Sequence, residues 1–362
     1  MQSEVTINQL NFITMKKITL LFMMLLATSI ITNAQITVDN SPGVTANPPF
    51  LYTDLTSAIS AASNDAVIYV QPSEISYGII TVGKPLTLIG FGHSDPDKKT
   101  LLEDLILTTG ASNTTVSGFH IDDDFYLTNP LGTPLSNLVI ENNLIDSVLE
   151  FDDGGVDNVI IRGNIINIIG NISGNSSSNN YTNALITNNI VLSYIGLKNH
   201  QSITIKNNIF LSPNVSYAIN NAGNSTGSIT VQNNIVFYNS GSMNDPNSTG
   251  VIYENCLSYN VGAGSVVPLI GSTNLDNQDP LFVEDNDNAV FDGATNDFNL
   301  QAGSPAIGMG AGGVDMGLFD GSAFIFNNYG YTNGIPTVKI TDITDRIAPT
   351  ETLNVTISTN SN

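Results

Sequence analysis

Six nine-residue segments of this chain align without gaps, and the seventh position of each is asparagine. Position four is always Ile or Val, and position six is Asn or Gly except at Glu254 in the last segment. The segments are residues 137–145, 158–166, 183–191, 202–210, 228–236 and 249–257, with Asn143, Asn164, Asn189, Asn208, Asn234 and Asn255 at position seven. This recurrence indicates that one structural unit is stacked repeatedly along the chain.

The asparagines are 19 to 26 residues apart, which matches one coil of a parallel β-helix. Such a coil needs three short strands, at about 3.3 Å per residue, and three turns, and loops of different length account for the variable spacing. A leucine-rich repeat has a similar period but requires a Leu and Asn pattern that this sequence lacks. The sequence therefore predicts an all-β protein, a right-handed parallel β-helix (solenoid) with an N-terminal capping helix and a C-terminal capping segment.

Stacking explains the asparagine column physically. Side chains at one buried corner lie about 4.8 Å apart, so each amide can hydrogen-bond to the next. Position six suits a left-handed corner backbone, which Asn and Gly adopt readily, and position four is expected to point into the core. We therefore assign these asparagines no catalytic role. Position eight, from Leu144 to Cys256, forms an apolar column that either the C-terminal tail or a partner covers.

The patterns divide the chain into five parts. Residues 1–34 are upstream residues and a signal peptide, 35–65 an N-terminal cap, 66–271 the coils, 272–321 the C-terminal coils and cap, and 322–362 a short β tail. Within the first cap, residues 54–62 have the apolar spacing of a short helix, with Thr53 as its N-cap. The tail contains two alternating stretches, 337–344 and 351–359, which either pack on the solenoid or begin a sorting element.

The N-terminus has the three regions of a secretory signal peptide. Lys16 and Lys17 precede a 14-residue apolar run, and a small-residue cleavage site ends at Ala34. The run is short for a membrane span, so we expect a mature chain that begins at Gln35 and does not cross a membrane. The only cysteine, Cys256, allows neither an internal disulfide nor a lipid anchor at the signal. We expect a secreted protein in an extracellular, cell-surface or periplasmic location.

The net charge of the chain restricts the classes of partner that it can bind. The formal net charge is −22 at pH 7, from 10 Lys and Arg against 32 Asp and Glu. A surface this acidic repels nucleic acid and other polyanions unless cations intervene. We therefore expect no nucleic acid as partner, while the oligomeric state is left open.

A family resemblance rests on the two ends of the repeat as well as its middle. Residues 66–70 and 84–90 open it with Ala-Val-Ile-Tyr-Val and Lys-Pro-Leu-Thr-Leu-Ile-Gly, and residues 298–307 close it with Phe-Asn-Leu and Gly-Ser-Pro-Ala-Ile. With the Ile-x-Asn-Asn-Ile segments between them, residues 50–321 resemble the pectate-lyase-like superfamily of right-handed parallel β-helices, especially secreted proteins of Bacteroidetes-type bacteria. The superfamily includes lyases, hydrolases, epimerases, adhesins and proteins without known activity, so the resemblance implies the fold more than an activity.

Polysaccharide lyases of this superfamily use a Lys or Arg to remove the proton beside a uronate carboxyl, while calcium or another cation neutralises that carboxyl. Position five places Arg162 and Lys206 two coils apart, roughly 10 Å, which one sugar unit can bridge. These two residues, with Lys198 on a nearby loop, are candidate catalytic residues. The structural alternative is that Glu141 pairs with Arg162 on the neighbouring strand and Lys206 keeps the sheet soluble.

A second candidate site is acidic. Asp122, Asp123, Asp124 and Asp146 follow the corner column in consecutive coils, and Asp152 and Asp153 lie on the next loop. Stacked carboxylates repel one another unless a cation joins them, which makes these six residues candidate ligands of Ca²⁺. Solvated acidic turns explain the same pattern equally well. Asp pairs also act as acid and base in polygalacturonases of this fold, but the Gly-His-Gly and Arg-x-Lys motifs of that family are absent from the sequence.

Sugar rings stack on aromatic faces, and because the chain has no Trp this role falls to tyrosine. Tyr238 and Tyr259 each follow a repeat asparagine by four residues and are expected to stack on one face, with Tyr194 on a neighbouring loop. These three are candidate substrate-binding residues. Ordinary solenoid packing is the alternative.

Two functions of different class follow from these observations. The first is an extracellular protein that binds or processes polysaccharide, as a calcium-assisted lyase or, less favoured, a glycoside hydrolase. The second is a non-catalytic structural or adhesive β-helix. An open groove around Arg162 and Lys206 favours the enzyme, whereas occupation of Arg162 by Glu141 and by packing favours the structural protein.

Overall fold

The computed structural model describes residues 35–362 except 96–97, 152–153, 171–180, 198–200, 212–216, 222–226, 240–246, 249, 263–265, 320–323, 333–336, 344–354 and 361–362. The region predicted to carry the signal peptide, residues 1–34, lies outside this description. Residues Ile36–Asn362 form one compact unit, to which the following paragraphs refer.

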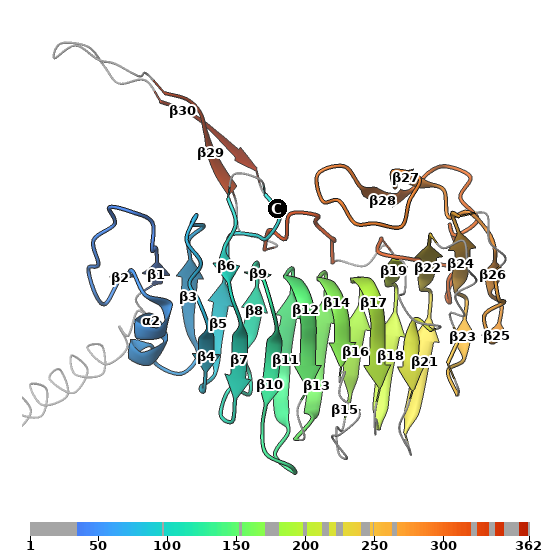
Figure 1. Ribbon diagram of the computed structural model, residues 1–362, viewed down its shortest axis with the longest axis horizontal. Coiled ribbons are helices and arrows are strands. Elements are labelled where there is room, and N and C mark those ends of the chain that lie inside the picture. Colours follow the sequence, from blue (N-terminus) through green and yellow to red (C-terminus); the bar gives the residue numbers. More distant parts are fainter. Residues whose placement is uncertain are drawn as a thin grey trace, which may run out of the picture. The chain divides into compact units, whose positions relative to one another are not determined.

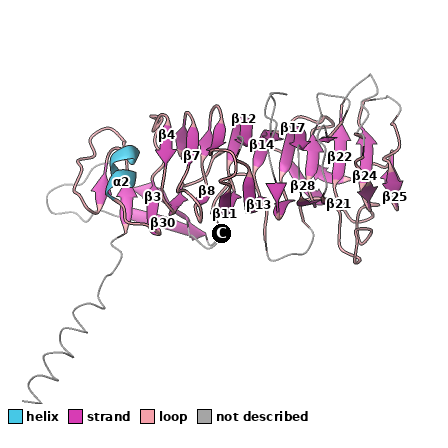
Figure 2. Cartoon of the chain, turned by 90° about the horizontal axis from the view of Figure 1, so that it is seen from below, coloured by secondary structure: helices cyan, strands magenta, loops and turns pink. Residues whose placement is uncertain are grey.

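The chain is a parallel β-solenoid of about 8 turns with very little helix, which confirms the predicted fold class. Successive coils add one strand to each of two long parallel sheets, so strands lie side by side along the solenoid (Figure 1). Figure 2 shows the strands of the two sheets in separate rows. Every strand pair within the two sheets is parallel, as the coil-by-coil repeat requires.

The order of strands in each sheet follows the order of the coils. Sheet 1 contains β2 (Leu51–Tyr52), β1 (Ile36–Val38), β3 (Ala66–Val70), β5 (Leu86–Ile89), β8 (Thr115–Ser117), β11 (Leu135–Glu141), β13 (Val156–Arg162), β16 (Ala184–Thr187), β18 (Ser202–Lys206), β21 (Ser228–Gln232), β23 (Tyr253–Glu254) and β25 (Gly271–Ser272), with β15 (Tyr181–Thr182) beside β13. Sheet 2 contains β4 (Ile80–Val82), β7 (Leu105–Thr108), β10 (Phe125–Thr128), β12 (Leu144–Phe151), β14 (Ile165–Gly170), β17 (Ile190–Leu197), β19 (Ile209–Leu211), β22 (Ile235–Tyr238), β24 (Leu257–Asn260) and β26 (Leu275–Asp276), with β6 (Leu101–Leu102), β9 (His120–Ile121) and β20 (Ile219–Asn221) attached at its side.

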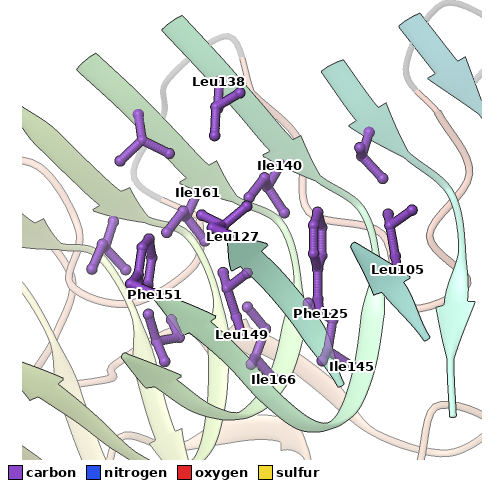
Figure 3. Packing of buried hydrophobic residues seen from close by; sticks show 14 of the residues in the cluster. Leu105, Phe125, Leu127, Leu138, Ile140, Ile145, Leu149, Phe151, Ile161 and Ile166 are labelled. Atoms are coloured by element: carbon purple, nitrogen blue, oxygen red, sulfur yellow. The ribbon is translucent and has the colours of Figure 1, made fainter. Parts of the chain in front are cut away.

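The core lies between the two sheets and consists of stacked aliphatic and aromatic side chains (Figure 3). Position four contributes Ile140 and Ile161 from sheet 1, which face Leu149 and Ile166 from sheet 2. In strands of sheet 1 such as β3 and β18, alternate residues face inward, so the buried pattern has the period of two that a pleated strand imposes. Burial of this continuous apolar stack holds neighbouring coils in register.

Helix α2 (Leu55–Ala61) lies against the strands of the first coils and buries Leu55, Ala58 and Ile59. Its N-cap is Asp54, whose carboxylate accepts a hydrogen bond of 2.7 Å from Ser57 N, so the prediction of Thr53 as the cap was wrong by one residue. At the other end, the Lys84 ammonium donates to the carbonyl of Ala62 at 2.9 Å. A cation at the carbonyl end of a helix is favourable for the helix dipole.

The predicted asparagine ladder is present at the corner between the two sheets. The backbone N–H of each ladder residue donates to the side-chain oxygen of the next: Asn143 to Asn164 at 2.9 Å, Asn164 to Asn189 at 3.0 Å, Asn189 to Asn208 at 3.0 Å, and Asn208 to Asn234 at 2.9 Å. The side-chain nitrogens add bonds to the same oxygens and to backbone carbonyls of the preceding coil. All these groups are buried and paired, as burial of amides requires.

The sixth segment is shifted by one residue relative to its predicted alignment. Strand pairing places Tyr253 beside Val231, so Tyr253 enters the core while Ile252 is 56% exposed. Asn255 consequently occupies position six, with a left-handed φ of 51°, and the ladder position falls to Cys256. The sequence did not reveal this shift, because most of the other segments have Asn at both positions six and seven. The single Asn255 is compatible with either position.

Cys256 replaces an amide within the ladder by a thiol. Its sulfur accepts from Asn234 N at 3.4 Å and donates to the carbonyl of Glu254 at 3.4 Å. Burial raises the pKa of the Cys256 thiol to about 12, so the group stays protonated and able to donate. The ladder then continues one step beyond the predicted column, because Cys256 N donates to the side-chain oxygen of Asn274 at 3.0 Å.

A second asparagine ladder lies on the outside of the solenoid. Asn137 donates to Asn113 at 2.9 Å and Asn158 donates to Asn137 at 2.6 Å, all through side chains at position one. Asn183 continues the column with a bond to Asp157. Each of these asparagines has a left-handed backbone with φ between 52° and 66°, which Asn tolerates better than other non-glycine residues.

Residues 306–319 and 324–332, which we name the return segment, run back along the ladder corner from the last coils toward the first (Figure 1). Position-six side chains hold its backbone in reverse order of the coils: Asn255 donates to Met309 O, Asn207 to Gly317 O and Asn188 to Leu318 O. Nearest the N-terminus, the hydroxyls of Ser117 and Thr332 lie 2.9 Å apart. The left-handed corner therefore also exposes amides that bind the C-terminal part of the chain.

The apolar column at position eight is covered by the same chain. Ile165, Ile190, Ile209, Ile235 and Leu257 form one buried cluster with side chains contributed by residues 282–326, among them Phe282, Phe298, Met316, Leu318 and Phe326. Of the two coverings expected from the sequence, the C-terminal part of the chain is the one observed. Most of the cover precedes the tail, however, since it begins at the antiparallel pair β27 (Phe282–Glu284) and β28 (Asp297–Leu300).

After the return segment, β29 (Thr337–Ile343) and β30 (Val355–Asn360) pair as an antiparallel hairpin. These strands coincide closely with the two alternating stretches predicted in the tail. Among the described residues, no helix is long and apolar enough to cross a membrane.

We predict that Asn189→Ala lowers the free energy of unfolding by about 2–4 kcal/mol, because it leaves the buried N–H of Asn164 without its acceptor and opens a small cavity. Urea unfolding followed by far-UV circular dichroism measures the change. Asn158→Gly removes an exposed ladder amide while keeping the left-handed backbone, and is expected to cost no more than about 0.5 kcal/mol. Equal losses for the two variants would contradict the ladder's role.

We also predict that Cys256→Asn raises the free energy of unfolding by about 0.5–1.5 kcal/mol, because an amide replaces the long sulfur contacts with ordinary hydrogen bonds. Cys256→Ala is the matched comparison and is expected to lower it. Calorimetric melting of both variants checks the order, and a Cys256→Asn protein that melts below the wild type would show that the site is too tight for an amide.

Candidate functional site

The position-five column of sheet 1 places Arg162 and Lys206 as predicted, two coils apart with Thr187 between them. Arg162 is not available, however. Its Nη2 and Nε both lie 2.7 Å from one oxygen of Glu141, and the guanidinium lies 4.8 Å from the ring centre of Phe324. An ion pair combined with a cation–π contact is a packing role, so the structural interpretation of Arg162 is favoured.

Lys206 is half-buried and lies between Thr187 and Gln232 in the sheet. The third predicted basic residue, Lys198, lies outside the described residues, as do Asp152 and Asp153 of the acidic candidates. Among the described residues, the position-five column therefore offers Lys206 only Arg162 as a basic partner, and the guanidinium of Arg162 is bound to Glu141.

The three candidate tyrosines do not form one sugar-binding face. Tyr238 is fully buried, and its strand partner is Asn260, while Tyr259 is paired with Phe237 and lies 5.9 Å from that ring. This arrangement follows from the one-residue shift at Cys256, which moves Tyr259 out of the column of Tyr238. Tyr194 is partly buried in an edge-to-face contact of 6.1 Å with Tyr217.

The acidic candidates gather around a histidine that the sequence interpretation did not single out. Strand pairing sets Ile121 beside Ile145, so the residues that follow, Asp122 and Asp146, emerge next to each other. His120 Nε2 lies 2.8 Å from Asp146 Oδ2 and 3.9 Å from Asp122 Oδ1. The imidazole is about one-tenth exposed, whereas both carboxylates face solvent.

Lys99 joins the same group from the other side of the ring. Its Nζ lies 3.3 Å from His120 Nδ1, just before strand β6. An ammonium can only donate, so Nδ1 accepts from Lys99 and Nε2 carries the hydrogen that is donated to Asp146. The contacts therefore define a chain of three groups, Lys99–His120–Asp146, in which the histidine tautomer is set by its two neighbours.

The other described acidic candidates, Asp123 and Asp124, follow Asp122 directly in the sequence. Asp124 accepts from Val148 N at 3.0 Å and from the Tyr126 hydroxyl at 2.6 Å, a bond that raises the pKa of Tyr126. Asp123 is exposed, and the negative charge of Asp124 is the main cause that raises the pKa of Asp123, followed by burial and by Asp104. Repulsion among carboxylates is thus present, as the sequence interpretation assumed.

His120, Asp122 and Asp146 offer three ligand atoms within 4.8 Å of one another. This donor set does not suit the predicted Ca²⁺, which takes six to eight oxygen ligands and no imidazole. Lys99 also places a positive charge at Nδ1, on the opposite side of the ring from Nε2, where it repels a cation bound to the imidazole. We therefore derive no chemical step through calcium at these residues.

No family model matches the chain, and neither a curated protein nor a solved structure matches it. The fold and the geometry described above are accordingly the observations on which a function can be argued.

His120 had a detectable signal in the sequence. It occupies position eight of the upstream segment 113–121, a position that holds Leu, Ile or Cys in the six aligned segments. A histidine in an otherwise apolar column indicates a local role other than packing. Lys99 has no comparable signal, because it precedes β6 on a loop outside the repeat.

We predict that Arg162→Ala lowers the free energy of unfolding by about 1–2 kcal/mol, since it leaves Glu141 half-buried without its partner and removes the contact with Phe324. Lys206→Ala, which removes the same charge from the same column, is expected to change it by less than about 0.5 kcal/mol. Urea unfolding of both variants gives the comparison. If Lys206→Ala were the more costly of the two, the packing role of Arg162 would be refuted.

Proposed function

We propose that this chain is a secreted β-helix of the pectate-lyase-like kind that acts on extracellular polysaccharide, with Lys99 and His120 as its reacting groups. The observation that carries the proposal is the hydrogen-bonded chain Lys99–His120–Asp146. It combines an exposed amine, an imidazole and a carboxylate, which is the arrangement of a general base supported by a proton relay. The parallel β-helix fold and the predicted signal peptide support the extracellular setting.

Lys99 is the proposed base because its amine is exposed, while the His120 ring is mostly buried. In its neutral form the amine takes the proton from the carbon beside a uronate carboxyl. The electron pair of that bond forms a carbon–carbon double bond as the neighbouring glycosidic carbon–oxygen bond breaks, and the departing oxygen takes a proton from water. His120 then accepts a proton from the Lys99 ammonium through Nδ1, and Asp146 stabilises the resulting imidazolium through Nε2. The imidazolium finally gives a proton to the hydroxide left by that water, which restores neutral Lys99 and His120.

In this proposal Lys99 and His120 take the catalytic role that the sequence predicted for Arg162 and Lys206. Arg162 is held by Glu141 and Phe324, whereas Lys99 belongs to the loop beside the acidic group. The carboxylates of Asp122, Asp123 and Asp124 repel an acidic sugar unless a cation screens them, so cation dependence stays part of the proposal although no calcium ligand set is assigned.

A non-catalytic structural or adhesive protein is the second candidate. The observation that favours it is the occupation of Arg162 together with the burial of Tyr238, since both residues were candidates for substrate contact and both have packing roles. In that case the Lys99–His120–Asp146 chain only joins neighbouring coils at the surface.

The test is incubation of the purified protein with plant and algal polysaccharides, with calcium and with chelator, while unsaturated uronate absorbance and new reducing ends are followed. We expect unsaturated product whose rate of formation falls by about 10²–10⁴-fold in Lys99→Ala and in His120→Gln. Lys206→Ala removes an equal charge elsewhere and is expected to retain the wild-type rate.

Reducing ends without unsaturation would replace elimination by hydrolysis. Absence of product across the panel, from protein with a native circular dichroism spectrum, would favour the structural candidate. A Lys206→Ala variant as inactive as Lys99→Ala would return the catalytic role to the position-five column.

A further inference from the structure

His93 is a fully buried histidine on the loop between β5 and β6. Its Nδ1 lies 2.6 Å from the hydroxyl of Ser94. Its other ring nitrogen, Nε2, is buried and has no hydrogen-bond partner among the described residues. A ring with one satisfied and one unsatisfied nitrogen can remain buried only while it is neutral, because a second N–H would have no acceptor.

The end of the return segment covers this ring. The carbonyl of Tyr329 accepts a hydrogen bond of 2.8 Å from His93 N, and Gly330 lies directly on the imidazole. A Cβ added at Gly330 would overlap Cδ2 and Nε2 of His93, and Gly330 has a left-handed φ of 70°. Glycine is therefore required both for the backbone conformation and for the closeness of the contact.

Among the described residues, the charged and titratable groups around the contact include Asp95, Lys98, Tyr331 and His120. Asp95 accepts a bond of 2.5 Å from the Tyr331 hydroxyl, and the Lys98 ammonium lies 5.8 Å from the centre of the Phe91 ring. His120 is the group that interacts electrostatically with His93. Thr332 and Ser117 complete the contact with a neutral hydroxyl pair at 2.9 Å. None of these contacts gives Nε2 an acceptor for a second proton.

Burial, with a smaller contribution from His120, lowers the pKa of His93 to about 3, while a histidine in open chain has a pKa of about 6.5. The pKa of the docked His93 ring is the lower of the two. The ring is therefore neutral in both the docked and the undocked form above about pH 6.5, and docking is strongest there. Below that pH the ring takes up a proton in the undocked form and stays neutral in the docked form. Each further pH unit then favours the undocked form by about tenfold, down to about pH 3.

We propose that His93 and Gly330 form an acid-sensitive latch, in which protonation of His93 releases residues 327–332 of the return segment from the first coils. The contacts of the return segment to Asn188, Asn207 and Asn255 involve no titratable side chain, and Phe324 packs on Arg162, whose guanidinium stays charged throughout this pH range. Release is therefore confined to the end of the segment beside Lys99 and His120. The inference stands independently of the proposed enzyme activity.

Hydrogen exchange of the intact protein, read by mass spectrometry on peptides covering residues 324–332, tests the latch. Between pH 7 and pH 4.5, after correction for intrinsic rates, we expect the opening equilibrium of these amides to rise on the order of 100-fold. Peptides from the ladder strands are expected to change far less. His93→Leu cannot take up the proton and is expected to abolish the rise.

Two further variants separate the latch from general acid effects. His120→Gln removes the other described histidine and is expected to leave the rise in place. Gly330→Ala forces a clash with His93 and is expected to expose residues 327–332 at pH 7 already, which also serves as the test should His93→Leu fail to fold. Equal protection of wild-type residues 327–332 at the two pH values, or full protection in Gly330→Ala, would overturn the proposal.

Discussion

The structure depends on one interaction, the hydrogen bond from the backbone N–H of one corner asparagine to the side-chain oxygen of the asparagine one coil further on. A corner in left-handed conformation breaks the strand pairing and leaves a buried N–H that needs an acceptor. The amide supplies it, and its nitrogen also donates to carbonyls of the preceding coil, as Asn164 does to Ile140. Each coil thus supplies the acceptor that the corner N–H of its neighbour needs. This explains why asparagine recurs at the corner while the loops vary in length.

The same corner determines where the C-terminal part of the chain lies. Position six has a left-handed backbone, which Asn and Gly adopt most readily, and where it is Asn its side-chain amide lies outside the ladder. The return segment uses these amides: Asn188 and Asn207 donate to its carbonyls, while Gly163 leaves room for Phe324. The neighbouring column at position eight is apolar and is buried by residues of the same C-terminal part. The polar column at position six and the apolar column at position eight therefore both bind the C-terminal part of the chain.

Much of this architecture could be predicted because it follows from the repeated segments. The fold class, the ladder from Asn143 to Asn234 and the inward position four follow from period and residue type alone. The error at Asn255 has a physical origin, since Asn is acceptable at both positions six and seven, and only the size of the coil interior, filled by Tyr253, decides between them. The contact of Arg162 with Phe324 joins residues far apart in sequence, and no periodicity links them.

The groups that we propose as reactive lie where the ladder has not yet begun. From Asn143 onward, positions four, six, seven and eight are committed to the core, the corner and the return segment, and position five holds Arg162 in an ion pair. In the preceding coil, Phe119 takes the ladder position and its N–H donates to Asn143, while position eight becomes His120. That substitution exchanges an apolar contact for an imidazole with a lysine on one side and a carboxylate on the other. The proposed reactive group, His120 beside Lys99 and Asp146, therefore belongs to a coil that departs from the repeat, where position eight is free to hold something other than an apolar side chain.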